Sequence, residues 1–306
     1  MDTAQAAAEF ERHRDHLTGV AYRMLGSLVD AEDAVQETYL RFSRAAGPGV
    51  RDVRAWLTTT VARICLDSLG SARARRETYT GPWLPEPVIS GGAGPAPVGL
   101  GPEDRVTLDE SVSMAMLVLL ESLSPAERTA LILRDVLGLP YGEVSQVLGR
   151  SQAACRQLVT RARAHVRQRA PRFTPEPGQH ARAVDAFLAA CSHGSVEELV
   201  RVLDPGVVLR SDGGGLVPGV ARRPVTGPGP VARLLLGVAA RRPAQPRLGT
   251  VNGSPGVVFE DTEGVVGVMA FTVADHLITE IDFVVNPDKL RRAGRRSHRA
   301  SEEAGS

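Results

Sequence analysis

Residues 141–169 read YGEVSQVLGRSQAACRQLVTRARAHVRQR, and this stretch decides how the middle of the chain folds. Apolar spacing predicts a short helix from Tyr141 to Leu148, and Gly149 is the residue type that ends a helix in the left-handed conformation. Ser151 then supplies the N-cap of a long helix that runs to about Arg169. Two helices joined by a three-residue turn predict a helix-turn-helix, whose second helix enters the major groove of DNA.

The two sides of the long helix predict different contacts. The apolar side, expected to be buried, consists of Cys155, Leu158, Val159, Ala162 and Val166. The polar side, expected to be exposed, consists of Gln152, Arg156, Thr160, Arg163 and Arg167. Gln and Arg side chains pair with base edges, and Arg also neutralises phosphates. Residues 145–172 contain seven Arg and no acidic residue, so DNA binding is favoured over the alternative of a solvated basic surface.

Composition narrows the class of protein. The chain has 306 residues, 43% of them hydrophobic, and its 36 basic and 35 acidic side chains give a formal net charge of +1. These values exclude a disordered or fibrous chain and fit one large domain or two domains. Its three Cys residues stand far apart, the first residues lack a signal-peptide layout, and no apolar run approaches the ~18 residues of a membrane span. We therefore expect a cytoplasmic protein without disulfides, metal site, cofactor or membrane contact.

Helical periodicity predicts two helical domains separated by a linker. The first covers residues 1–77, with Asp30 as the N-cap of its second helix. Dense Pro and Gly mark residues 78–104 as the linker, in which Trp83 is expected to dock on a folded surface. The second helical domain covers residues 105–172.

Two local patterns organise the second helical domain. Ser124-Pro125-Ala126-Glu127 is a capping box with Pro at the first helical position, which predicts a helix start. For the helix before it, the expected apolar face consists of Val112, Ala115, Met116, Leu119 and Leu123.

The last third of the chain changes from helical to strand patterning. Helices are expected at 180–191, 196–203 and 230–241, and strands at 207–210, 247–252, 257–260, 265–274 and 277–285. Helices followed by a meander of antiparallel strands indicate an α+β domain over residues 178–290, and residues 291–306 are expected to be a disordered tail. The predicted fold is therefore multidomain, with two all-α domains and one α+β domain.

Three stretches together resemble a known family. Residues 30–41, DAEDAVQETYLR, look like the core-polymerase-binding helix of a bacterial sigma factor. Residues 55–76 resemble the helix that reads the −10 promoter element, and residues 123–128 with the helix-turn-helix resemble the domain that reads the −35 element. Two such domains joined by a linker are similar to the extracytoplasmic function (ECF) type, and the resemblance covers residues 10–170. It implies a transcription initiation factor that binds core RNA polymerase, through its clamp helices and flap, and promoter DNA.

The resemblance also implies roles for individual side chains. Binding to core polymerase is implied for Asp30, Glu32, Asp33, Gln36 and Glu37. Contact with the −10 element is implied for Arg51, Arg54, Arg63, Arg73, Arg75 and Arg76, and a base flipped from the melted DNA would be captured beside the loop at 46–51. Contact with the −35 element is implied for Ser151, Gln152, Ala154, Arg156, Gln157, Thr160, Arg161 and Arg163.

Further motifs resemble the sigma factor subgroup that carries a fused SnoaL-like domain. They are WLPEP at 83–87, DGGG at 212–215 and NPDKL at 286–290. In that subgroup the extra domain acts in cis in place of a separate anti-sigma protein. Regulatory contact with the sigma domains is therefore implied for Trp83, Leu84, Pro85, Asp212, Gly213, Gly214, Gly215, Asn286, Pro287, Asp288, Lys289 and Leu290. The pattern departs at Leu216, where the subgroup usually has Lys.

An enzyme is the alternative, because SnoaL-like domains include polyketide cyclases. The available acid–base groups are Asp212, Asp275, His276, Glu280 and Asp282. Glu280 and Asp282 share one face of a strand and are expected to be solvated or interfacial, and no helix N-terminus follows Gly213–Gly215 to bind a phosphate. Because these motifs lack a catalytic context, we expect no enzyme and no catalytic residue. A DNA-binding regulator fused to a ligand-binding or catalytic cone remains the alternative function, and a small ligand of unknown identity remains open.

Overall fold

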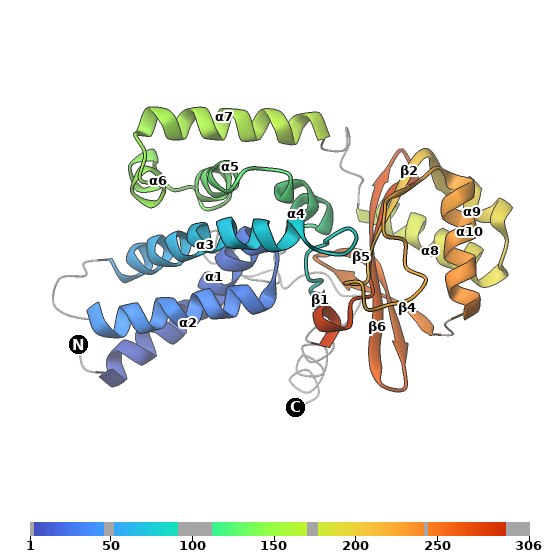
Figure 1. Cartoon of the computed structure of the whole chain (residues 1–306), viewed down its shortest axis with the longest axis horizontal. Coiled ribbons are helices and arrows are strands. Elements are labelled where there is room, and N and C mark those ends of the chain that lie inside the picture. The colour runs from blue at the N-terminus through green and yellow to red at the C-terminus, as the bar shows by residue number, and fades with distance from the viewer. Residues whose placement is uncertain (1–2, 46–51, 91–111, 170–176, 242–243, 292–306) are drawn as a thin grey trace. The chain divides into compact units, whose positions relative to one another are not determined.

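The computed structural model describes residues 3–45, 52–90, 112–169, 177–241 and 244–291, and these form two compact units (Figure 1). The helical unit contains residues 3–77 and 117–169. The C-terminal unit contains residues 78–90, 112–116, 177–241 and 244–291, so the first residues of the helix that begins at Met114 are grouped with it. The loop at 46–51, the linker residues 91–111 and nearly all of the expected tail lie outside the described residues.

Three long helices form the first half of the helical unit: α1 (Thr3–Leu25), α2 (Leu28–Ala45) and α3 (Val53–Glu77). Aromatic rings join them, since the centroids of Phe42 and Trp56 lie 5.7 Å apart and those of Phe10 and Phe42 lie 6.5 Å apart. The predicted N-cap at Asp30 is wrong. The hydroxyl of Ser27 accepts the Asp30 amide at 3.2 Å, so Ser27 caps α2 and Asp30 lies in its first turn, where the helix dipole favours an acid.

The second half of the helical unit contains the predicted helix-turn-helix. Its elements are α4 (Met114–Glu121), α5 (Pro125–Leu131), the π-helical turn η1 (Ile132–Val136), α6 (Tyr141–Leu148) and α7 (Gln152–Arg169). The capping box at Ser124 and Glu127 is formed, and Gly149 ends α6 with φ at +60°. The Ser151 hydroxyl accepts a hydrogen bond from the Ala154 backbone amide at 3.2 Å and so caps α7. These caps confirm the predicted turn.

The apolar face predicted for α4 is wrong at every position but Leu123. The buried side chains are Met114, Leu117, Leu120 and Leu123, whereas Met116 is exposed and Leu119 is only half-buried. Residues 114–120 are all apolar, so the sequence contains no polar residue to reveal which face is buried.

A curved sheet and three helices form the C-terminal unit. Figure 1 shows α8 (Pro177–His193), α9 (Val196–Val202) and α10 (Pro228–Arg241) on one side of the sheet. The sheet order is β1-β4-β5-β6-β7-β2-β3. Its strands are β1 (Ile89–Ser90), β2 (Leu203–Asp212), β3 (Val225–Thr226), β4 (Gln245–Val251), β5 (Ser254–Asp261), β6 (Gly264–Ala274) and β7 (Leu277–Val284). This architecture confirms the predicted α+β class.

Two strand pairings differ from the predicted antiparallel meander. Strands β4 to β7 do form it, but β2 pairs with β7 in parallel, with Asp212 opposite Val284. In addition, β1 comes from the predicted linker and pairs with β4, with Ile89 opposite Val251. Residues 84–89 are buried, so this part of the linker belongs to the C-terminal fold and is not a solvated connection.

Candidate functional site

The acidic side of α2 carries the side chains expected to bind core polymerase. Glu32, Asp33 and Gln36 are exposed, while Asp30 and Glu37 are half-buried. Glu37 pairs with Arg41 one turn later, at 2.8 Å. The apolar stripe of α2 is buried against α1 and α3, so the acidic side is left at or near the surface of the helical unit.

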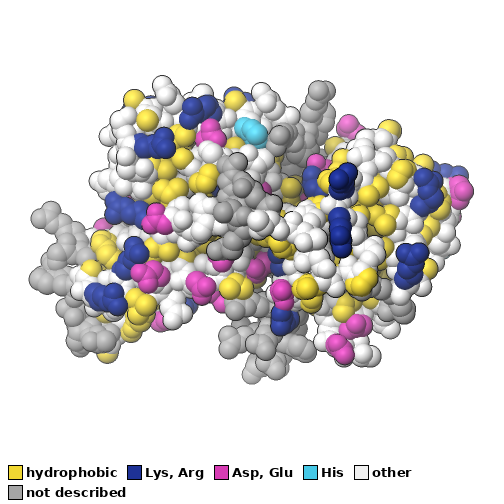
Figure 2. Space-filling view, in the orientation of Figure 1, with side chains coloured by type: hydrophobic (Ala, Val, Ile, Leu, Met, Phe, Trp, Pro, Cys, Tyr) yellow, Lys and Arg dark blue, Asp and Glu magenta, His cyan; other side chains and the backbone are white. Residues whose placement is uncertain are grey.

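Helix α7 separates its apolar and polar sides as the sequence predicts. Cys155, Leu158, Val159 and Ala162 are buried, and Val166 is half-buried. The exposed residues of the predicted DNA-reading set are Ser151, Gln152, Arg156, Gln157, Thr160, Arg161 and Arg163, and Ala154 is half-buried. Figure 2 shows basic side chains on the part of the surface formed by α6 and α7. In Figure 1, α5 and α6 lie between α3 and α7, which leaves the polar side of α7 free of α3.

Several arginines on this surface are oriented by neighbours. Arg163 makes two hydrogen bonds to the carboxylate of Asp135, at 2.6 and 2.8 Å. The guanidinium of Arg156 lies 5.2 Å from the centroid of the Tyr141 ring. Both contacts are made by exposed arginines and are worth little free energy by themselves, so they hold the side chains in place without removing them from solvent.

Helix α3 carries the side chains expected at the −10 element, and two of them contact the other half of the helical unit. Exposed Arg63 donates to the carbonyl oxygen of Gln146 in α6 at 3.0 Å. Arg76 donates to the carbonyl oxygen of Leu25 at 2.6 Å and pairs with Glu121. Arg54 is half-buried. Arg51 and the side chains of Arg73 and Arg75 lie outside the described residues.

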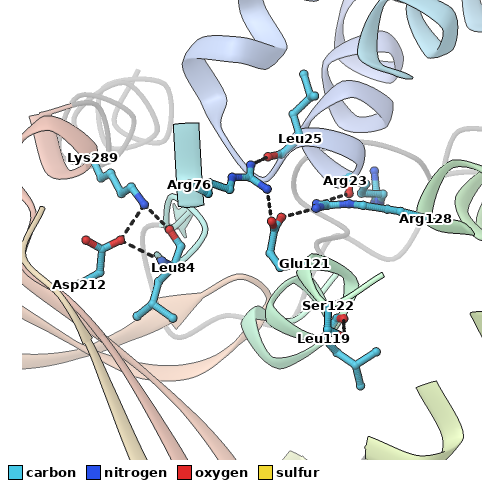
Figure 3. Close-up of polar contacts among 10 residues, drawn as sticks. All are labelled: Arg23, Leu25, Arg76, Leu84, Leu119, Glu121, Ser122, Arg128, Asp212 and Lys289. Atoms are coloured by element: carbon cyan, nitrogen blue, oxygen red, sulfur yellow. Dashed lines mark hydrogen bonds and ion pairs between the residues drawn. The ribbon is translucent and has the colours of Figure 1, made fainter. Parts of the chain in front are cut away.

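Glu121 is the centre of a cluster that joins α1, α3 and α5 (Figure 3). Its carboxylate accepts hydrogen bonds from Arg76 of α3 and from Arg128 of α5. Arg128 also donates to the carbonyl oxygen of Arg23 at 3.2 Å, as Arg76 does to that of Leu25. These two carbonyls end α1, where no intrahelical donor remains and the helix dipole favours cations. Burial lowers the pKa of Arg76, and the charge of Glu121 opposes this effect.

Asp212 is the centre of a second cluster, in the C-terminal unit, which we call the clasp: Tyr79, Trp83, Leu84, Asp212, Asn286 and Lys289. The fully buried carboxylate of Asp212 accepts from the Lys289 ammonium at 2.7 Å and from the Leu84 amide at 2.9 Å. Lys289 also donates to the carbonyl oxygen of Leu84, and its ammonium lies 4.0 Å from the centroid of the Trp83 ring. Figure 3 shows Lys289 and Asp212 converging on Leu84. The prediction that Trp83 docks on a folded surface is confirmed.

Tyr79 joins Asp212 to Asn286 within the clasp, and two glycines of the DGGG segment lie beside it. The Tyr79 hydroxyl donates to Asp212 at 2.6 Å and accepts from the Asn286 amide at 2.7 Å. Burial, followed by the hydrogen bond to Asp212, raises the pKa of Tyr79, so the donor proton is retained. A Cβ on Gly214 would lie 2.6 Å from Asn286, and one on Gly215 would lie 2.9 Å from Thr80. Both glycines have positive φ, so the DGGG segment fits here only without side chains.

Three of the acid–base groups considered for catalysis have structural partners: Asp212 in the clasp, and Glu280 and Asp282 on β7. Arg210 bonds to Asp282 at 2.6 Å and to Glu280 at 2.7 Å. Asp282 was expected to be solvated or interfacial, and its 2% exposure shows that the first alternative is wrong. Burial raises the pKa of Asp282, and the ion pair with Arg210 opposes that rise. Asp275 and His276 form the turn between β6 and β7, both with positive φ.

Sequence reasoning missed three residues of these clusters: Tyr79, Glu121 and Arg128. Each acts on a partner at least seven positions away, so no local pattern marks it. Arg128 only ends the stretch at 123–128 that resembles the −35-reading domain, although its 2% exposure makes it one of the most buried charges in the described part of the chain. Among the described residues, no helix is both long and apolar enough to cross a lipid bilayer.

Comparison with known proteins agrees with this geometry. Residues 10–75 match the family model for sigma-70 region 2, and residues 113–166 match that for sigma-70 region 4. The ECF RNA polymerase sigma factor SigJ of Mycobacterium tuberculosis is 38% identical over 305 residues, covering 96% of each chain. The probable ECF sigma factor SigI of the same species is 37% identical, covering 93% of this chain and 94% of SigI.

A solved structure extends the likeness to the whole fold. The crystal structure of Mycobacterium tuberculosis SigJ matches 93% of this chain and 98% of its own chain, with a TM-score of 0.74 and 36% identity. The match therefore includes the C-terminal SnoaL-like domain as well as the helical domains. Sigma factors bind core RNA polymerase and promoter DNA in the cytoplasm and are not enzymes. The chain belongs to the ECF RNA polymerase sigma factors and acts in transcription initiation.

Proposed function

We propose that each half of the helical unit performs one step of promoter recognition. The acidic side of α2 binds the clamp helices of core polymerase through the five side chains from Asp30 to Glu37, which packing leaves at or near the surface. The exposed side of α7 reads the −35 element through Gln152, Arg156 and their neighbours. Helix α3 contacts the −10 element through its arginines. In this active state the protein is associated with the nucleoid.

Promoter binding requires the two halves of the helical unit to part, and the observation that carries this step is that two arginines of α3 already have partners. Arg63 bonds to α6 and Arg76 pairs with Glu121, so both are engaged within the helical unit. A promoter separates its −10 and −35 elements along the duplex, whereas α3 packs directly on α5 and α6 here. The arrangement is therefore a resting state, and promoter binding requires the two halves to part.

The C-terminal domain regulates this step in cis through the clasp. Residues 79–89 are the part of the linker that leads away from α3, and the clasp fixes them to β2 and to Asn286–Leu290. A linker held in this way has less chain free to span a promoter, so opening the two halves is restricted. Leu216, at the position of the usual Lys, is 59% exposed and contributes no cation to this contact.

Run-off transcription with core polymerase tests the proposal. The full-length chain is compared with a chain that ends at Arg172 and with one truncated just before Asn286. The proposal is supported if the chain that ends at Arg172 gives promoter-dependent transcript and if the chain truncated before Asn286 gives a different amount of transcript from the full-length chain. Unchanged output after removal of Asn286–Leu290 overturns regulation through the clasp.

Core binding has its own matched control. The double substitution Asp33→Arg with Glu37→Arg should abolish capture of core polymerase. Glu11→Arg with Asp15→Arg makes the same charge change at the same spacing on α1 and should leave capture intact. Equal capture by both pairs would instead favour an ordinary DNA-binding regulator fused to a cone.

A further inference from the structure

The C-terminal unit encloses a cavity of about 570 Å³ between its helices and the concave face of its sheet. The walls are contributed by α8, α10, strands β2 and β4 to β7, and the loop at 217–221. This volume falls within the range of pockets that hold small organic molecules. The sigma-factor role described above makes no use of this cavity.

The chemistry of the walls selects the kind of ligand. Aromatic rings from three elements face the cavity: Phe187, Phe259 and Phe283. The charged residues that line it are Arg241 and Asp261, both exposed and therefore at its mouth, and their charges cancel. Burying an ionised group among such walls is costly, whereas a ring gains from contact with aromatic side chains. Ser211 adds one buried hydroxyl to the interior, enough to orient a single polar group, whereas the hydroxyl of the other lining serine, Ser192, is exposed and donates to the Ala189 carbonyl oxygen.

The cavity and the clasp adjoin each other at two stretches of chain, the end of β2 and the residues just after β7. Ser211 lines the cavity and the next residue, Asp212, is the centre of the clasp. Val285 lines the cavity and the next residue, Asn286, belongs to the clasp. Successive residues of an extended chain point to opposite faces, so one stretch of backbone presents a side chain to each site. The Val285 amide also donates to the Asp212 carbonyl oxygen at 2.8 Å, which ties the two stretches together.

The DGGG segment makes a second connection. Gly214 and Gly215 lie close against Asn286 and Thr80, and the chain then continues into residues 217–221, which form a wall of the cavity. When the clasp opens, Gly214 and Gly215 lose this support, and the wall can move away from a bound molecule. A ligand that needs the wall in place therefore binds the closed clasp more tightly than the open one.

We propose that the cavity binds an uncharged, ring-containing apolar small molecule and that its binding stabilises the closed clasp. The proposal that a ligand binds is argued from the cavity alone. The proposal that binding regulates the sigma factor rests on the function proposed for the clasp. Occupancy would then hold the linker and keep the sigma factor in its resting state.

Titration of the full-length chain with N-phenyl-1-naphthylamine, a neutral fluorescent probe of this class, tests binding. Saturable binding of one probe per chain is expected. Val238→Trp places a large ring in the cavity from α10 and should weaken the affinity by about tenfold or more. Ala240→Trp lies on the same helix outside the cavity lining and should leave the affinity within about twofold.

A measurement on the unsubstituted chain covers the case in which Val238→Trp fails to fold. Cys191 lines the cavity and is half-buried, while Cys65 and Cys155 are buried elsewhere. The bound probe should slow alkylation of Cys191 by N-ethylmaleimide and leave the other two thiols unaffected. Absence of saturable binding, or an unprotected Cys191, overturns the site.

Hydrogen exchange tests the coupling on the same samples. Saturating probe should slow exchange of the Leu84 amide, which bonds to Asp212, by about threefold or more. Binding without slower exchange overturns the coupling. Both readouts work without polymerase, so failure of the run-off experiment would count against the proposed function and not against the ligand site.

Discussion

Asp212→Asn should release the linker from the C-terminal domain. Asp212 is fully buried and accepts four hydrogen bonds, from Tyr79, Leu84, Gly214 and Lys289. The amide keeps the shape but loses the charge, and it leaves the Lys289 ammonium, 7% exposed, without its carboxylate. Breaking a buried ion pair from one side costs about 3–5 kcal/mol. The free energy needed to open the clasp should fall by that amount.

Hydrogen exchange at the Val88 amide measures this loss. Val88 donates to Asn252 at 3.1 Å and does not bond to Asp212, so its exchange reports departure of the linker and not a changed acceptor. A fall of about 3 kcal/mol corresponds to exchange about a hundredfold faster. Asp288→Asn removes an exposed carboxylate paired with Arg291 and should cost less than about 1 kcal/mol.

A second substitution separates charge from packing. In Asp212→Asn with Lys289→Met, the uncompensated charge is gone, so much of the lost stability should return. The reasoning is refuted if Asp212→Asn behaves like Asp288→Asn, or if adding Lys289→Met doubles the loss.

Three further outcomes test other parts of the fold. Glu121→Gln leaves Arg76 and Arg128 without their carboxylate and should lower the free energy of unfolding of the helical unit by about 3 kcal/mol in urea titration, against less than about 1 kcal/mol for the exposed Glu11→Gln. Ser124→Ala removes the cap of α5 and should cost about 1 kcal/mol in the same titration. Burial lowers the pKa of His180, so the unfolded chain binds that proton more readily and stability falls as the pH drops below the ordinary histidine value. The loss in melting temperature between about pH 7.5 and about pH 5.5 should therefore be smaller in His180→Gln, and an equal loss would contradict this.

Local chemistry made the start of α5, the end of α6 and the surface of α7 predictable, whereas the start of α2 was misplaced because Ser27 and Asp30 are both cap-forming residue types. Gly149 and the Ser124 capping box act within one turn of chain, so their residue types suffice to place the ends of α6 and α5. The polar and apolar sides of α7 alternate at helical spacing, so both sides follow from the sequence. In α4 the same reasoning failed, because a segment that is apolar all round has no preferred face until its neighbours are placed.

Pairings between distant segments could not be read in the same way. The parallel pairing of β2 with β7 and the addition of β1 to β4 join residues about 70 and 160 positions apart, and nothing in the short strands encodes the partner. Lys289 was marked only through the resemblance of its motif, and Asp212 through that resemblance and as one of several acid–base groups. Tyr79 was not marked at all, although it bonds to both Asp212 and Asn286.

The two clusters differ in what can open them. On its proposed role, Arg76 exchanges the carboxylate of Glu121 for a DNA phosphate, so one anion replaces another and promoter DNA offsets much of the cost of parting the helical halves. The clasp has no such exchange, because its cation, Lys289, is buried between Asp212 and the Trp83 ring and is not among the side chains proposed to contact DNA. DNA binding alone therefore cannot offset the free energy needed to open the clasp. Its state must be set by something that acts on the C-terminal domain itself, and the cavity, which adjoins the clasp at the end of β2 and just after β7, is the described feature positioned to do so.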